Sequence, residues 1–156
     1  MEIDTAVRRM LLQDDTVKGY VQAKVFKNEL LEHVDGTSGM ALVVRKAGGW
    51  QGPSQQMEFP LVAVECWADV DRDQMGLKIR DNQLDKAYSL YRAVKRLMHD
   101  KRDVWWGAGG AERGCRVILS EQQSEPVHNL ISYSKGGTTV PAAESAVVTV
   151  QYEITL

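Results

Sequence analysis

The sequence predicts an α+β fold: a mainly antiparallel sheet of about five strands, with an N-terminal helix and a long central helix packed on one face. Three observations support this. An apolar segment at 61–67 precedes a helical pattern that continues to about residue 100. A short amphipathic pattern lies near the N-terminus, and a strictly alternating pattern occupies 146–155. This order of elements favours an antiparallel sheet with its helices gathered on one side.

Length and composition agree with a single domain over residues 1–156. Apolar residues make up 44% of the chain and charged residues 26%, as in ordinary globular proteins. The chain has 19 Lys and Arg against 21 Asp and Glu, whereas a protein that mainly grips nucleic acid usually has a basic excess. No apolar run reaches the roughly 20 residues that cross a bilayer, and the acidic N-terminus does not resemble a signal peptide. We expect synthesis in a cytoplasm and no membrane association.

In the first half of the chain, apolar residues recur at helical spacing from Ile3 to Leu11, which predicts a helix that ends near 14–15. Weak alternation at 21–27 and an apolar run at 40–45 predict the first two strands. The third, at 61–67, is apolar at nearly every position, so we expect both of its faces to be covered. The polar, glycine-containing stretches at 28–39 and 48–59 are predicted as long loops.

The second half begins with the central helix, which is clearest from Leu84 to Met98. Its apolar residues form one stripe, and its charges run from acidic to basic, as the helix dipole favours. Strands are predicted at 115–120 and 146–154, with long loops at 101–113 and 121–144. Loops of this length in a compact domain are usually functional or disordered. Cys66 and Cys115 both lie in strand-like segments and are expected to be reduced.

Motifs that would indicate catalysis or metal binding are incomplete. Asp69, Asp71 and Asp73 resemble the start of a calcium loop, but Gln74 and Arg80 stand where that loop needs Gly and Glu. A solvated turn is the preferred interpretation.

The glycines at 107–110 leave a helix and enter a strand, the reverse of a dinucleotide-binding context. The chain has no phosphate-binding Gly-Lys-Ser/Thr, no nucleophile elbow and no zinc-ligand spacing among His33, His99 and His128. We therefore predict no catalytic, cofactor or metal site and no enzyme activity.

Trp105 and Trp106 are the most informative candidate interface residues, since adjacent tryptophans cannot easily both enter one core. Either one anchors a partner surface, where Trp is often an energetic hot spot, or one indole seals the helix end and the other lies on the surface. The same alternatives apply to Trp50 in its polar loop. Arg102 and Lys135 complete the candidate interface, although a solvated helix end explains most of the basic run that contains Arg102.

Five segments, taken in order, are similar to one protein family. They are a short helix at 7–12 followed by two aspartates, a Val25-Phe26 strand, a strand at 40–45, a strand at 60–67 that ends in Trp, and a closing strand at 148–154. In this pattern the chain resembles the tail terminator, or tail completion, proteins of long-tailed bacteriophages. It departs from the family where Asn28 replaces a usual proline, and where 69–81 and 121–144 are extended.

The resemblance implies a structural virion protein that forms a ring, commonly a hexamer, on the end of the growing tail tube. The ring would stop tube polymerisation and join the tail to the head connector, after assembly in the host cytoplasm. The implied partners are further copies of the chain, the tail tube protein and the head connector or completion protein. DNA would pass through the lumen without specific binding, and no cofactor is implied.

Two alternatives to the terminator function stay open. One is a related head-tail adaptor or neck protein. The other, from a different class, is a small ligand-binding α+β module. Its pocket would lie between the long helix and the sheet and would be lined by Tyr88 and Tyr91, whose helical spacing is more often that of core residues.

Overall fold

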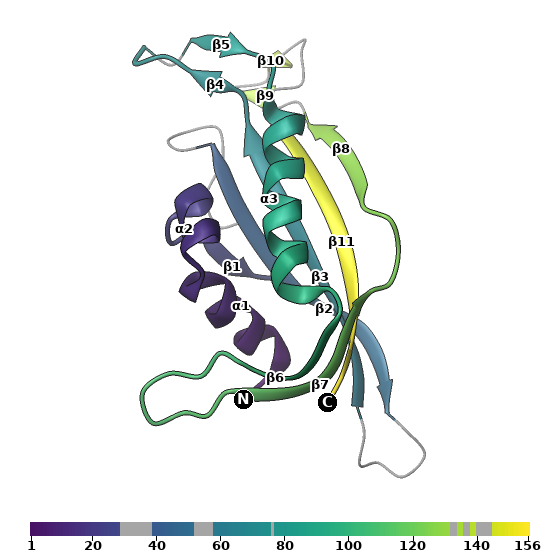
Figure 1. Cartoon of the computed structure of the whole chain (residues 1–156). Coiled ribbons are helices and arrows are strands. Elements are labelled where there is room, and N and C mark those ends of the chain that lie inside the picture. Colours follow the sequence, from purple (N-terminus) through teal and green to yellow (C-terminus); the bar gives the residue numbers. More distant parts are fainter. Residues whose placement is uncertain (29–38, 52–57, 76, 132–133, 136–137, 140–144) are drawn as a thin grey trace.

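The computed structural model describes residues 1–28, 39–51, 58–75, 77–131, 134–135, 138–139 and 145–156. Within these residues a main sheet of seven strands has the order β1-β2-β3-β11-β7-β6, and β8 also pairs with β11 (Figure 1). The strands of this sheet are β1 (Val25–Lys27), β2 (Met40–Gln51), β3 (Glu58–Asp69), β6 (Lys101–Trp106), β7 (Cys115–Gln122), β8 (Val127–Ile131) and β11 (Ser145–Thr155). Two short hairpins are formed by β4 (Asp71–Arg72) with β5 (Lys78–Arg80), and by β9 (Ser134–Lys135) with β10 (Thr138–Thr139).

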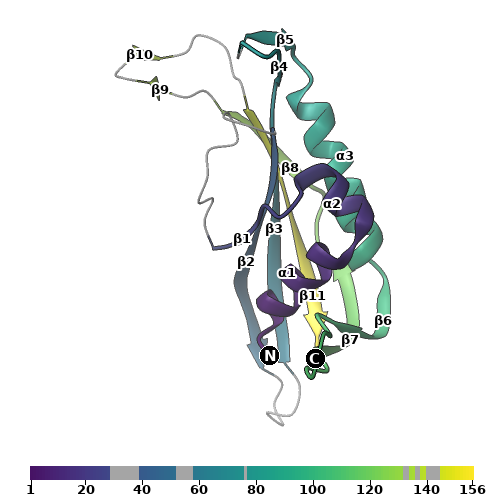
Figure 2. The ribbon, with the colours of Figure 1, turned by 90° about the vertical axis from the view of Figure 1, so that its left-hand side faces the viewer.

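Three helices in the described residues cover one face of the sheet: α1 (Ile3–Gln13), α2 (Asp15–Val21) and α3 (Gln83–Met98). Figure 2 shows the sheet edge-on, with all three helices on the same side. Strand pairs in the main sheet are antiparallel except β1 with β2, which is parallel. The predicted α+β class is confirmed, with a mixed, mostly antiparallel sheet.

The core lies between the helices and the sheet, because α1 and α3 are amphipathic and each has one apolar stripe. Leu11 and Leu90 are fully buried, as are Leu42, Val64 and Tyr152 on the sheet. Burying side chains of this size stabilises the fold by roughly 1.5–3 kcal/mol each. The tertiary structure therefore rests mainly on this one layer of contacts.

The first predicted strand, at 21–27, is wrong in its first half. Val21 is instead the last residue of α2, and residues 22–23 form a turn. Helix α2 is capped by Asp14, whose side chain accepts a hydrogen bond from the Val17 N–H at 3.0 Å. Val17 and Val21 of this helix are fully buried. The strand that remains, β1, begins only at Val25.

Several segments predicted as loops contain strands. The 48–59 loop is too wide, since β2 continues to Gln51 and β3 begins at Glu58; residues 52–57 lie outside the described residues. The 101–113 loop is wrong at its start, where β6 forms and pairs with β7. The 121–144 loop is interrupted by β8, whose partner is β11. Most of the 28–39 loop lies outside the described residues. In the 48–59, 101–113 and 121–144 segments, cross-strand pairing overrides a polar local sequence.

Strand β11 lies in the middle of the sheet. It pairs with β3 from Ser145 to Glu153, with β8 from Ser145 to Thr149, and with β7 from Tyr152 to Thr155. Its predicted alternation is confirmed, because Val148, Val150 and other inward residues belong to the core. The predicted central helix is also confirmed as α3.

Both cysteines are free thiols in strands, as predicted: Cys66 in β3 and Cys115 in β7. Burial raises the pKa of the Cys66 thiol strongly and that of Cys115 to a smaller degree. A thiol with a raised pKa forms little thiolate at neutral pH, so Cys66 is expected to be chemically inert.

Candidate interface surfaces

The face of the main sheet opposite the helices is here called the helix-free face. The side chains at its centre are largely inaccessible to solvent. Directly opposed residues in an antiparallel pair point to the same side, so Val43, Glu65 and Thr149 share this face, as do Ala41, Trp67 and Val147. Val43 and Ala41 are almost inaccessible, which agrees with the expectation that the central strands are covered on both faces.

Glu65 lies at the centre of this face and is fully partnered. Its Oε2 atom accepts a hydrogen bond from the Trp67 indole N–H at 3.1 Å, and its Oε1 atom lies 3.2 Å from the Arg45 guanidinium. The carboxylate is mostly buried, and such groups cost free energy unless they are paired in this way. The centre of the helix-free face is thus structurally satisfied, and its exposed apolar side chains lie nearer the sheet's ends and edges.

Trp50 lies on an arm formed where β2 and β3 extend beyond the rest of the sheet (Figure 1). Its ring is more than half exposed and stacks on Phe59, with centroids 4.3 Å apart and planes 12° apart. Gly49 makes this approach possible, because a Cβ there would lie 2.6 Å from the Phe59 carbonyl oxygen. The stacked pair is therefore held in place on the arm, with the Trp50 ring open to solvent.

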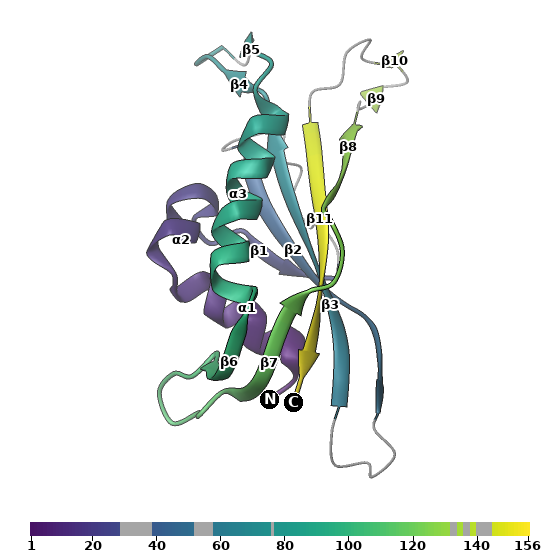
Figure 3. The same cartoon turned by 45° about the vertical axis from the view of Figure 1, so that its right-hand side comes forward.

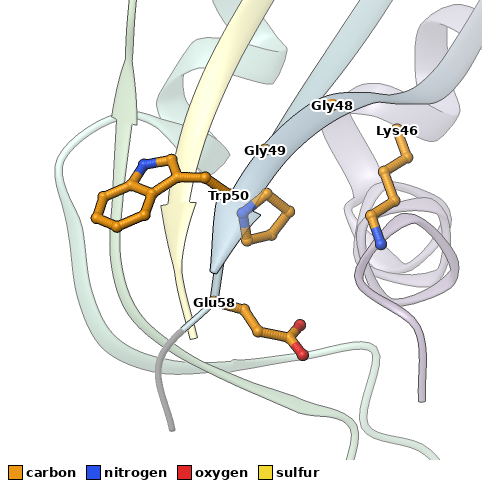
Figure 4. Close-up of a pocket in the computed structure, with 6 residues that line it drawn as sticks. Lys46, Gly48, Gly49, Trp50 and Glu58 are labelled. Carbon is orange, nitrogen blue, oxygen red and sulfur yellow. The ribbon is translucent and has the colours of Figure 1, made fainter. Parts of the chain in front are cut away.

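An open depression lies beside the arm, lined by Lys46, Gly48, Gly49, Trp50, Glu58 and Pro60. Figure 4 shows Trp50 directed away from the side chains of Lys46 and Glu58. The depression therefore has charged groups of both signs on one side and an exposed indole on the other.

The structure separates the two adjacent tryptophans. Trp106 is 4% exposed and belongs to the core, whereas Trp105 is 53% exposed. Neighbouring residues of a strand point to opposite faces, so one indole is buried and the other is exposed. The next residue, Gly107, lies against Ala6 of α1, and a Cβ added to Gly107 would lie only 2.8 Å from the Ala6 Cα. Of the two candidate anchors, only Trp105 exposes its indole to solvent.

The two remaining sequence candidates differ in what the structure describes. Arg102 is exposed on β6, with its Nε atom 3.6 Å from the Asp100 carboxylate. Lys135 lies in β9, and only its place in the strand is described. Trp50, Trp105, Arg102 and Lys135 therefore come from separate elements, and no single described cluster brings them together.

Sequence reasoning missed an apolar tip on the β4–β5 hairpin. Met75, Leu77 and Ile79 are 85%, 62% and 57% exposed at the end of the molecule opposite the Trp50 arm (Figure 1). The available signal was the alternation of these three residues within a polar stretch that was assigned to a solvated turn. Exposed apolar side chains grouped in this way commonly mark interaction sites.

The base of the hairpin is joined to α3 by one ion pair and to the residue before α3 by a hydrogen bond. Asp71 lies 2.9 Å from the Lys86 ammonium and accepts a hydrogen bond from Asn82 at 2.7 Å. The hydrogen bond from Lys86 lowers the pKa of the Asp71 carboxyl; burial raises it by less, and Asn82 and Arg80 lower it further. This network holds the apolar tip in one orientation relative to α3.

The three aspartates of the calcium-like sequence each have their own partner. Asp69 is buried against Arg72, with 3.1 Å between carboxylate and Nε, and Asp71 pairs with Lys86. Asp73 accepts hydrogen bonds from the backbone N–H groups of Met75 and Leu77. In the described part of the chain, no group of three or more His, Cys, Asp or Glu side chains could hold a metal ion.

Tyr88 and Tyr91 do not line either of the two described depressions. Tyr91 is a core residue whose hydroxyl donates to Gln122 Oε1 at 2.8 Å. The Tyr88 hydroxyl lies 2.8 Å from His128 Nδ1 and so connects α3 to β8. These contacts agree with the core interpretation of the two tyrosines.

Comparison with known proteins gives one informative finding. No protein-family model matches the sequence, and no curated protein matches it either. Among solved structures, the fold is similar to that of a chain from the virion of a native gene transfer agent (GTA) particle, with a TM-score of 0.64 at 10% identity. The similarity covers 98% of this chain and 92% of that chain. None of the described helices has the length and apolar character needed to cross a membrane.

Proposed function

We propose that the protein is a non-enzymatic structural component of a phage-like virion. The observation that carries this proposal is the fold shared over nearly the whole length of a GTA virion chain. Few residues of either chain lie outside the similarity, so the likeness extends to the whole fold and not to one motif. The partners of such a protein are other proteins of the particle.

Within the virion, we propose that it acts as the tail terminator. It forms a ring, commonly of six copies, that caps the tail tube, ends its polymerisation and joins it to the head connector. A ring needs contacts between different patches of neighbouring copies. The chain offers exposed apolar anchors on distant elements: Trp50 on the arm, Trp105 on β6 and the Met75 tip. Arg102 and Lys135 are proposed to contribute charged contacts.

The experiment is negative-stain microscopy of the purified protein, with its mass measured by light scattering across a concentration series. Closed rings with a central hole are the expected result. The double variant Trp50→Ala/Trp105→Ala should keep its circular dichroism spectrum and lose the rings, because both indoles are exposed anchors. The matched control is Tyr20→Ala, an exposed aromatic residue on α2, which should leave the rings intact.

Purified tail tube protein from the same particle gives the second test. Added terminator should stop tube growth and decorate one tube end, whether or not rings form in its absence. If the protein neither forms rings nor binds tube ends, and binds the head connector instead, the terminator proposal is wrong and the adaptor function takes its place.

A further inference from the structure

One edge of the sheet, β1, is blocked by a side chain. The backbone groups of Lys24 and Asn28 bond to β2, so the carbonyl of Val25 between them points away from β2. That carbonyl already accepts a hydrogen bond from Arg8 Nε at 2.7 Å. An edge whose carbonyl is occupied in this way cannot readily pair with a further strand.

The free edges of the β2 arm and of β6 are blunted in other ways. The arm has a bulge between Lys46 and Gly48, and Gly48 and Gly49 have φ angles of 120° and 130°. Strand β6 begins with charged residues, and Asp103, with φ of 47°, drops out of its ladder. Bulges, glycines and charged side chains at an edge all disfavour further pairing.

Strand β8 has none of these protective features. Its five residues, Val127–Ile131, contain no charge, proline or glycine, and none has a positive φ. It pairs with β11 on one side and with no described strand on the other, at the rim of the sheet in Figure 3. Val127 and Leu130 are 62% and 54% exposed. An edge without charged residues and with exposed apolar side chains is a template for another strand.

We propose that β8 pairs antiparallel with β8 of a second copy, about a two-fold axis at Asn129. Of the edges compared above, β1 is blocked and the β2 arm and β6 are blunted, so β8 is the edge that a second copy can best offer. In this register Val127 faces Ile131 of the second copy on the helix-free face, and Leu130 faces its His128 on the helix side. Because β8 carries no charge, the two strands meet without like-charge repulsion. Such isologous contacts are the commonest in homo-oligomers.

The edge is held ready for pairing by α3. The Tyr88 hydroxyl contacts His128 Nδ1 at 2.8 Å, and the two rings meet edge to face with centroids 5.8 Å apart. This contact fixes β8 before a partner arrives, so little ordering is needed on binding. A pair of five-residue strands is still a small interface, and we expect a reversible dimer that forms with rising concentration.

This contact goes beyond the proposed ring function. A ring is closed by contacts between different patches, whereas β8 pairs with its own copy. The dimer is therefore a property of the free protein, and its presence or absence does not decide whether rings form.

Cysteine cross-linking tests the pairing and its register. Asn129→Cys is placed in a Cys115→Ser background, where the remaining Cys66 is fully buried. At tens of micromolar protein and under mild oxidation, we expect disulfide dimers at least about ten times faster than for the control Glu121→Cys. Glu121 is exposed, but its strand, β7, is paired on both sides.

The register is tested by mixing two further variants in the same background. Val127→Cys and Ile131→Cys should cross-link when mixed and not when oxidised separately. Cross-linking of Asn129→Cys no faster than the control would overturn the proposal, as would Val127→Cys dimers that form equally well alone.

Sedimentation of the unmodified protein gives an independent readout. A monomer–dimer equilibrium is expected, and Asn129→Lys should shift it at least about ten-fold toward monomer, because residue 129 faces its own copy and two like charges would meet at the two-fold axis. Its unchanged circular dichroism spectrum would show that the variant folds. A wild-type protein that stays monomeric up to hundreds of micromolar contradicts the β8 pairing.

Discussion

Gly114 shows how a single residue can control a whole hairpin. It has a φ of 83°, and an added Cβ would overlap the carbonyl oxygen of Trp106 and lie 2.7 Å from the Ala108 nitrogen. The chain here must pass directly against the end of β6. Gly110 in the same loop also has a positive φ, 57°, but has open space around it. A substitution at Gly110 therefore tests backbone strain alone, whereas one at Gly114 tests backbone strain together with steric overlap.

We expect Gly110→Ala to lower the free energy of unfolding by about 1 kcal/mol, the cost of a left-handed conformation. Gly114→Ala should lower it by at least about 2 kcal/mol more, because the backbone of β6 must move. Urea unfolding followed by circular dichroism measures both. Equal losses in the two variants would show that the contact with Trp106 does not constrain the hairpin.

Residue identity alone could not have distinguished Trp105 from Trp106. Sequence reasoning left open which indole would be buried, and the answer depends on the pairing of β6 with β7, which places Trp106 opposite Cys115. The same limit applies to Trp50, whose exposure depends on its stacking with Phe59 across two strands. Non-local pairing decides the orientation of these side chains.

Among the elements, the β4–β5 hairpin gives a prediction that depends on pH. The pKa of Asp71 is lowered in the folded protein, chiefly by its hydrogen bond from Lys86. A carboxyl group with a lowered folded pKa stabilises the protein above its unfolded pKa, near 3.8, and loses that contribution as pH falls through the folded value.

Asp71→Asn should therefore lower the free energy of unfolding at pH 7 by at most about 1 kcal/mol, since the pair is partly exposed. The difference from the wild type should shrink as pH falls below 3.8 and disappear once pH has passed through the lowered folded pKa of Asp71. Asp81→Asn, which removes an exposed ion pair with Lys78, is the control and should have almost no effect. Thermal unfolding at a series of pH values measures this; a difference that stays constant with pH would contradict the role of the Asp71 charge.

Elements with a strong hydrophobic period were predictable, and weakly patterned ones were not. The stripe of α3 and the alternation of β11 identified both elements, because each is amphipathic. Helix α2 was missed since its seven residues have little room for a period and depend on the Asp14 cap. Strand β8 was missed because its exposed residues acquire strand structure only by pairing with β11.

For the whole molecule, the charge balance leads to a prediction about DNA. The net charge is −2, and counterion release gives strong binding only when many cations meet phosphates. We expect no retention of double-stranded DNA at 150 mM salt in a gel-shift assay with tens of micromolar protein, and only weak retention at low salt. A steep salt dependence, with retention at 150 mM salt, would contradict the proposed ring, through whose lumen DNA is expected to pass without being held.

The central position of β11 also affects how the protein is made. A ribosome produces β3, β7 and β8 before β11, yet β11 is the strand that pairs with all three. During synthesis the β2–β3 and β6–β7 hairpins cannot yet be joined into one sheet. Strand β11 joins them through contacts between residues far apart in the chain. Folds of this type form slowly, because the chain loses entropy in closing long loops before the stabilising non-local contacts form. The sheet, and any assembly that depends on it, can be completed only after translation has passed residue 155.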